Sequence, residues 1–141
     1  MANVIYDSFL ADMAAGNCNT SHSYKMMLVS SSYTEDRAAH TKRSNITGEV
    51  SGTGYTAGGI AVTLSFAVNT GTHIGTLTIG GGSWTSSTIT ARKAVVYRTR
   101  GGASSADELV CCIDNGVDIS SSSSTLSVAA STWAIPLPVP V

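Results

Sequence analysis

Charged residues are scarce in this sequence. Asp, Glu, Lys and Arg make up 12% of its 141 residues and give a formal net charge of −1, whereas about a quarter of an average protein is charged. A surface that binds nucleic acid or an anionic membrane needs an excess of positive charge. We therefore expect neither as a partner. A net charge near zero also opposes self-association less than usual.

Cysteine is scarce too, and a secretory signal is missing. Cys18, Cys111 and Cys112 are an odd number of cysteines, two of them adjacent, which is not the pattern of a disulfide framework. Neighbours on a strand point to opposite faces, so Cys111 and Cys112 cannot easily share a metal or bridge each other. The N-terminus has no basic region ahead of an apolar run, and no apolar run is long enough to span a bilayer. We expect buried free thiols in a protein that folds in a reducing cytoplasm.

Patterns of catalytic or metal-binding residues are also missing. His22, His40 and His73 do not stand at metal-ligand spacing from another His or Cys. The glycine triplet at 80–82 is not followed by the Lys and helix of a phosphate-binding loop. The adjacent Asp107 and Glu108 are interpreted as the charged end of a strand. The sequence therefore predicts no enzyme, no metal site and no cofactor.

What the sequence does contain is typical of a mainly β protein. Ser and Thr supply most of the polar residues, and both favour strands and turns over exposed helices. Residues 60–68 alternate between apolar and small polar side chains, which indicates a half-buried strand. Met26 to Val29 are apolar without alternation, which predicts burial on both faces of a strand. Further strands are expected at residues 74–79, 89–100, 108–114 and 125–130, with a hairpin turn at Asn115-Gly116.

The two ends of the chain differ from this β body. Apolar residues at helical spacing between Val4 and Ala15 predict a short helix within residues 1–16, capped by Gly16. Three prolines alternate with apolar residues in the segment 132–141, which predicts an extended tail that cannot be a central strand. We expect the tail to lie in a surface groove of its own body or of another subunit. The chain of 141 residues is thus predicted to be one domain, a jelly-roll-like β-sandwich with an N-terminal helix and a C-terminal tail. A plain sandwich and a partly open barrel share these patterns.

Most charges of the middle of the chain fall in residues 33–47. A long polar connection in a small β domain is either a solvated loop or a functional surface. In the second interpretation Arg37, Lys42 and Arg43 anchor a partner, because cationic side chains pair with carboxylates and arginine also stacks on rings.

Four blocks of the sequence resemble a known family. They are NVIYDSFLADM near the start, YKMMLVSSSYT at 24–34, HTKRSNITGEVSGTGYTAGG at 40–59 and WTSSTITARKAVVYR at 84–98. In this order they resemble a family of small virion structural proteins of tailed bacteriophages, which includes a head-decoration (cement) protein with a jelly-roll-like sandwich. The resemblance covers about the first hundred residues. The serine run at 120–124 and the proline-rich tail depart from it, which leaves the mode of binding open.

The resemblance implies a virion protein that binds the major capsid protein on the outside of the head. From the missing secretory signal we expect it to be made in the host cytoplasm, and from its apolar helix and tail we expect it to form a dimer on the shell. A tail or baseplate component would share the same blocks. A carbohydrate-binding adhesin module would instead use the rings of Tyr55, Trp84, Tyr97 and Trp133 as stacking platforms. The residues expected to contact a partner come from the helix, the charged loop and the tail: Phe9, Met13, Arg37, Lys42, Arg43, Trp133, Ile135, Leu137 and Val139.

Overall fold

A computed structural model describes residues 3–136, and the chain in this range is mainly β with one α-helix. This agrees with the predicted mainly β class and with the expected helix near the N-terminus. The elements are β1 (Val4–Ile5), α1 (Asp7–Ala14), β2 (Tyr24–Val29), η1 (Arg43–Asn45), β3 (Ile60–Val62), β4 (Leu64–Asn69), β5 (Ile74–Ile79), β6 (Gly82–Ser87), β7 (Thr90–Arg98), η2 (Ser104–Ala106), β8 (Leu109–Ser120), β9 (Ser124–Val128) and β10 (Ser131–Pro136).

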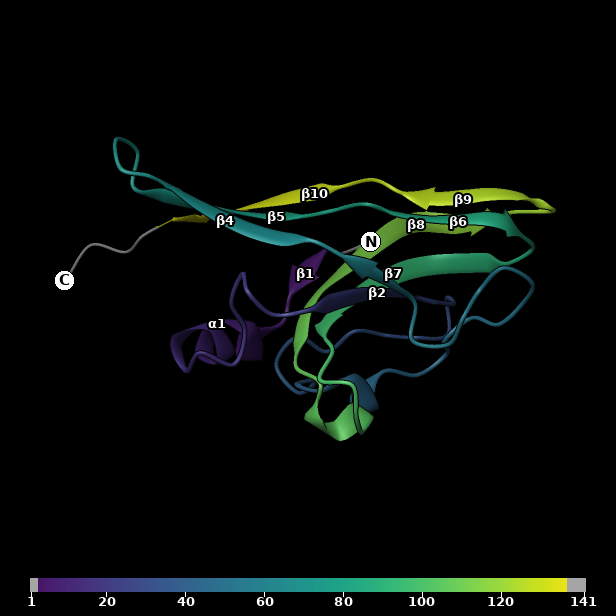
Figure 1. Ribbon diagram of the computed structural model, residues 1–141, viewed down its shortest axis with the longest axis horizontal. Helices are drawn as coiled ribbons and strands as arrows, with labels where there is room; N and C mark the ends of the chain where they lie inside the picture. Colours follow the sequence, from purple (N-terminus) through teal and green to yellow (C-terminus); the bar gives the residue numbers. More distant parts are fainter. Residues whose placement is uncertain (1–2, 137–141) are drawn as a thin grey trace.

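The strands form antiparallel sheets in two facing layers (Figure 1). One layer is a five-stranded sheet in the order β1-β8-β7-β2-β3. The other contains the three-stranded sheet β10-β5-β4 and the two-stranded sheet β6-β9. The chain changes layer at Thr63, between β3 and β4, so the predicted strand at 60–68 is a corner strand that pairs with both sheets.

The five-stranded sheet is buried on both faces. Met26 and Leu28 of β2 point into the main core between the two layers, where they meet Leu77 and Trp84 of the opposite layer. Side chains of the other face, among them Met27, form a second core with Tyr33 and Ile46 of the following loop. This confirms the prediction from the unbroken apolar run in β2. It also confirms that Cys111 and Cys112 point to opposite faces, since one lies in each core.

The N-terminal helix is shorter than predicted. Val4 and Ile5 pair with Cys112 and Cys111 as strand β1, so the helix begins only at Asp7. Its C-terminus is as expected: Gly16 has φ of +79° and its N–H donates to the Met13 carbonyl at 3.1 Å. Long-range pairing with β8 therefore overrides the helical pattern at Val4 and Ile5.

The predicted hairpin at Asn115-Gly116 is wrong. Strand β8 continues through this dipeptide to Ser120 and pairs with β7 on both sides of it. The register shifts between Lys93↔Asp114 and Ala91↔Ile119, so that residues 115–118 bulge out opposite a single residue of β7. Gly116 takes the positive φ of 83° that the bulge needs.

The first part of the predicted tail is a strand. Residues 131–136 pair with β5 over their whole length, from Ser131↔Ile79 to Pro136↔Ile74. Strand β10 lies at the edge of its sheet, where a proline is tolerated because one side of the strand has no ladder partner. The segment 132–141 is therefore not a free tail as far as Pro136. Leu137 and Val139 lie outside the described residues.

Candidate partner-binding surface

The three-stranded sheet extends past the end of the five-stranded sheet and above α1 (Figure 1). We call this part the overhang: residues 66–69 of β4, 74–75 of β5 and 135–136 of β10. Phe66 pairs with Leu77 of β5, and Val68 and Ile135 both pair with Gly75. Leu77 points into the main core, and residues two apart on a strand share a face, so all three side chains lie on the inner face of the overhang. The Phe66 ring lies over Gly75, where an added Cβ would approach its Cζ to 2.5 Å. The glycine thus makes room for the aromatic side chain.

Burial decreases along the overhang. Leu77 and Ile79, further back on β5, are fully buried, whereas Val68 near the tip is 48% exposed. The opposite face of this sheet carries small residues such as Ser65, Ala67 and Thr76. The overhang therefore presents apolar surface that the other residues within 3–136 leave exposed.

A groove of about 320 Å³ lies between the overhang and α1. Its walls are mostly apolar and come from β1, α1 and β10: Ile5, Phe9, Leu10, Met13 and Ile135. Leu10 is 66% exposed. An exposed apolar residue beside a concave apolar surface is a feature of protein-binding sites.

An ion pair forms the polar rim of this groove. The Arg37 Nε donates to the Asp7 carboxylate at 2.8 Å, and the Arg37 backbone carbonyl accepts from the Asp7 N–H at 2.9 Å. These contacts tie the loop to the first turn of α1. Both side chains are more than half exposed, so a partner can reach them.

The structure brings four of the nine predicted contact residues together at this groove: Phe9, Met13, Arg37 and Ile135. They are not equally accessible. Phe9 is 1% exposed and belongs to the main core, so it supports the groove from below. Trp133, two residues before Ile135, packs half-buried against the same core. The groove also includes Leu10, which was not among the predicted contact residues although it belongs to the same helical pattern.

Lys42 and Arg43 lie elsewhere and have partners inside the chain. The Arg43 Nε donates to Asp107 Oδ2 at 2.8 Å, and its guanidinium lies 5.0 Å from the centre of the Tyr97 ring. The Lys42 Nζ is 3.7 Å from Glu108 Oε1. The charged loop is therefore fastened to the body by these two cations, rather than solvated along its whole length.

Asp107 and Glu108 are the buried anions of this network. Arg100 donates from its Nε to both Glu108 carboxylate oxygens, at 3.0 and 3.1 Å, and from its backbone N–H to Asp107 at 2.9 Å. Burial by itself raises the pKa of Glu108, but the hydrogen bonds from Arg100 and the charge of Lys42 outweigh it and hold the pKa below its usual value. The two carboxylates thus act as a structural anchor for the loop.

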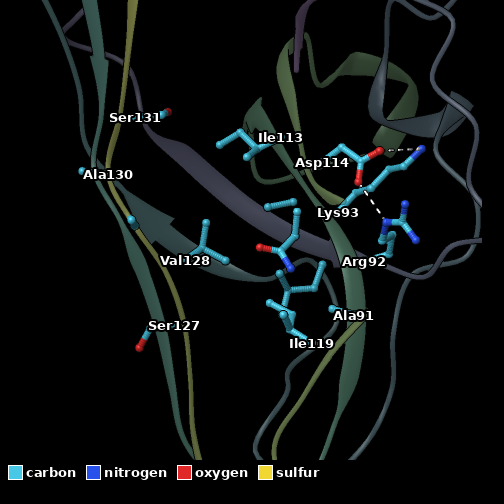
Figure 2. A pocket seen from close by; sticks show the side chains of 14 residues that line it. Ala91, Arg92, Lys93, Ile113, Asp114, Ile119, Ser127, Val128, Ala130 and Ser131 are labelled. Atoms are coloured by element: carbon cyan, nitrogen blue, oxygen red, sulfur yellow. Dashed lines mark hydrogen bonds and ion pairs between the residues drawn. The ribbon is translucent and has the colours of Figure 1, made fainter. Parts of the chain in front are cut away.

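A second cavity, of about 420 Å³, lies between β7–β8 and β9–β10 (Figure 2). Ile113, Ile119 and Val128 form its apolar walls. The charged groups at its side pair with one another: Arg92 donates to Asp114 at 3.0 Å, and Lys93 lies 3.9 Å from the same carboxylate. These pairs fit a structural role at the seam between the layers.

The aromatic residues considered as sugar platforms are largely covered. Trp84 and Tyr97 are each 2% exposed. The Tyr55 hydroxyl donates to Glu49 at 2.8 Å and also accepts from the Leu28 N–H at 3.1 Å. Trp84 and Tyr97 offer no free face for a sugar ring in this conformation.

All three cysteines are buried free thiols. Burial raises the pKa of Cys18 and of Cys112 to about 12 in each case, and raises that of Cys111 as well. Residues 3–136 contain no group of three His, Cys, Asp or Glu side chains placed to hold a metal ion. Within the same residues, no helix has the length and apolar character to cross a bilayer.

Comparison of the sequence and the structure with known proteins found no match. No protein-family model, curated protein or solved structure matches the chain.

Proposed function

We propose that this chain is a decoration, or cement, protein of a tailed-bacteriophage head. It binds the major capsid protein across subunit junctions on the outside of the assembled shell and stabilises the shell. In this proposal the two layers belong to a jelly-roll-type sandwich, and the protein is made in the host cytoplasm. The sequence blocks quoted above support the family, and the exposed apolar overhang supports a binding role.

The overhang is the observation that carries the binding role. Val68 and Leu10 expose apolar surface to water. Removing this surface from water by a bound partner is favourable and contributes to the free energy of binding. The body behind it is held rigid by two cores and by internal ion pairs. A rigid body with a projecting apolar edge suits a protein that must bridge neighbouring shell subunits, since little conformational entropy is lost on docking.

Cryo-electron microscopy of purified particles tests this proposal. We expect density of this chain over junctions between capsid subunits. Density on the tail would support the alternative, a tail or baseplate component that uses the same overhang to form a ring or tube. Absence of the chain from particles would refute both.

A pair of variants tests the overhang itself. Val68→Asp places a charge on the apolar inner face and is expected to weaken binding to particles that lack the protein by about tenfold or more, because the interface must desolvate the carboxylate. Val117→Asp is the matched control, since Val117 is 64% exposed on the β8 bulge and is not part of the overhang. Equal occupancy of the two variants would show that the overhang does not contact the shell.

A further inference from the structure

We propose that the groove between α1 and β10 receives the C-terminal segment, residues 137–141, of a second copy of this chain. Two chains related by a twofold axis would then exchange their ends, with each groove filled by the partner's segment. The exchange would make the groove a site of self-association as well as a part of the shell-binding surface. It concerns the purified protein and does not require a shell.

The chemistry of the segment matches that of the groove. Residues 137–141 read LPVPV and carry no charge or polar side chain. The groove offers aliphatic and aromatic walls from Ile5, Phe9, Leu10, Met13 and Ile135. Two apolar surfaces of this kind gain free energy when they cover each other. The prolines reduce the entropy that the segment loses on docking.

The lengths also agree. Five residues in a polyproline-like conformation span about 15 Å, and the eight residues of α1 span about 12 Å. One segment can therefore run along the whole helix and cover Leu10 and Met13. In this arrangement Leu137, Val139 and Val141 would supply the three aliphatic side chains of the segment.

The direction of β10 favours a second copy over the chain's own groove. Antiparallel pairing with β5 carries β10 outward, toward the turn between β4 and β5, and it ends at Pro136 opposite Ile74. The groove lies underneath the overhang, on the side of Ile135. The shortest continuation of β10 therefore leads away from its own groove, and filling that groove requires a turn back beneath β10. Prolines at 136, 138 and 140 oppose such a turn, because each fixes φ and restricts the residue before it to extended conformations.

A cysteine crosslink tests the arrangement. In the variant Leu10→Cys/Val139→Cys, mild oxidation is expected to give a covalent dimer on a non-reducing gel, because the two positions belong to different chains. The native thiols do not interfere, since all three are buried. Val117→Cys/Val139→Cys is the control for random collisions, because Val117 is about as exposed as Leu10 but does not line the groove. An internal crosslink within one chain, or no more dimer than the control, would overturn the proposal.

Complementation gives a second, independent test. A chain that ends at Pro136 keeps the whole of β10 but lacks the segment, and Leu10→Lys keeps the segment but blocks the groove. We expect the wild type to be dimeric by sedimentation, and each variant alone to dimerise on the order of a hundredfold more weakly. A mixture of the two should form a heterodimer, since one segment and one groove remain intact. A monomeric wild type, or a mixture that stays monomeric, would refute the exchange. Shell binding, measured separately on particles, could still hold in either case.

Discussion

Two arginines that look alike in the sequence have different roles in the structure, which leads to a prediction about stability. We expect Arg43→Ala to destabilise the fold and Arg37→Ala to leave it nearly unchanged. Arg43 is paired with Asp107, which is 1% exposed, and is itself only 24% exposed. Arg37 and its partner Asp7 are 61% and 52% exposed.

The expected magnitudes follow from these surroundings. Arg43→Ala removes a hydrogen bond between charged groups, which contributes about 1.5–3 kcal/mol in a buried setting. It also removes a cation–π contact with Tyr97 worth about 0.5–1 kcal/mol. Asp107 is left buried with the Arg100 backbone N–H as a donor. The loss is therefore about 2–4 kcal/mol, whereas an exposed pair such as Arg37–Asp7 contributes about 0–1 kcal/mol.

Urea unfolding of the two variants checks this prediction. With a denaturant slope of about 2 kcal/mol per molar, the midpoint is expected to fall by about 1–2 M for Arg43→Ala and by less than about 0.5 M for Arg37→Ala. Equal shifts in the two variants would refute the reasoning. They would mean that the Asp107 pair is too hydrated to hold the charged loop.

Three further predictions concern the interior. The pKa of Glu108 is held below its ordinary value of 4.5, so the unfolding free energy should fall as the pH drops through this value. The Glu108→Gln variant should lose less unfolding free energy than the wild type between about pH 6 and about pH 3. An equal loss in the two proteins would show that Glu108 does not cause the pH dependence. Gly59→Ala should cost at least about 3 kcal/mol in urea unfolding, because the new Cβ would lie 1.8 Å from the Met26 carbonyl oxygen; Gly101→Ala, at a similar positive φ but in open space, should cost only about 1 kcal/mol. The buried thiols, including Cys111, should react with a thiol reagent at about pH 8 only after unfolding, and fast reaction of the native protein would show that a core opens.

Local patterns were sufficient to predict the β class and much of the core. The alternation at 60–68 and the unbroken run at Met26 to Val29 each report how many faces of a strand are buried, because side-chain direction has a fixed period of two. For the same reason the placement of Cys111 and Cys112 on opposite faces follows from their adjacency. Gly16 was predictable as a helix cap because the requirement for positive φ is local.

Only the tertiary structure decided which segments pair. The dipeptide Asn115-Gly116 has the composition of a hairpin turn, but β7 pairs with β8 on both sides of it and makes it a bulge. The apolar pattern at Val4 continues that of α1, yet pairing with Cys112 draws it into a strand. In both cases contacts between distant residues outweigh a weak local preference.

The candidate site depended on tertiary structure for the same reason. The sequence selected Phe9, Met13, Arg37 and Ile135 from three separate segments, but it could not show that they meet at one groove, or that Phe9 lies beneath it. Nor could it distinguish Arg37 at the rim from Arg43, because the difference lies in carboxylates 30 and 64 residues away. The sequence by itself determined the kinds of surface that this chain has. The pairing of distant strands determined where they lie, because a ladder between β5 and β10 places Ile135 beside α1.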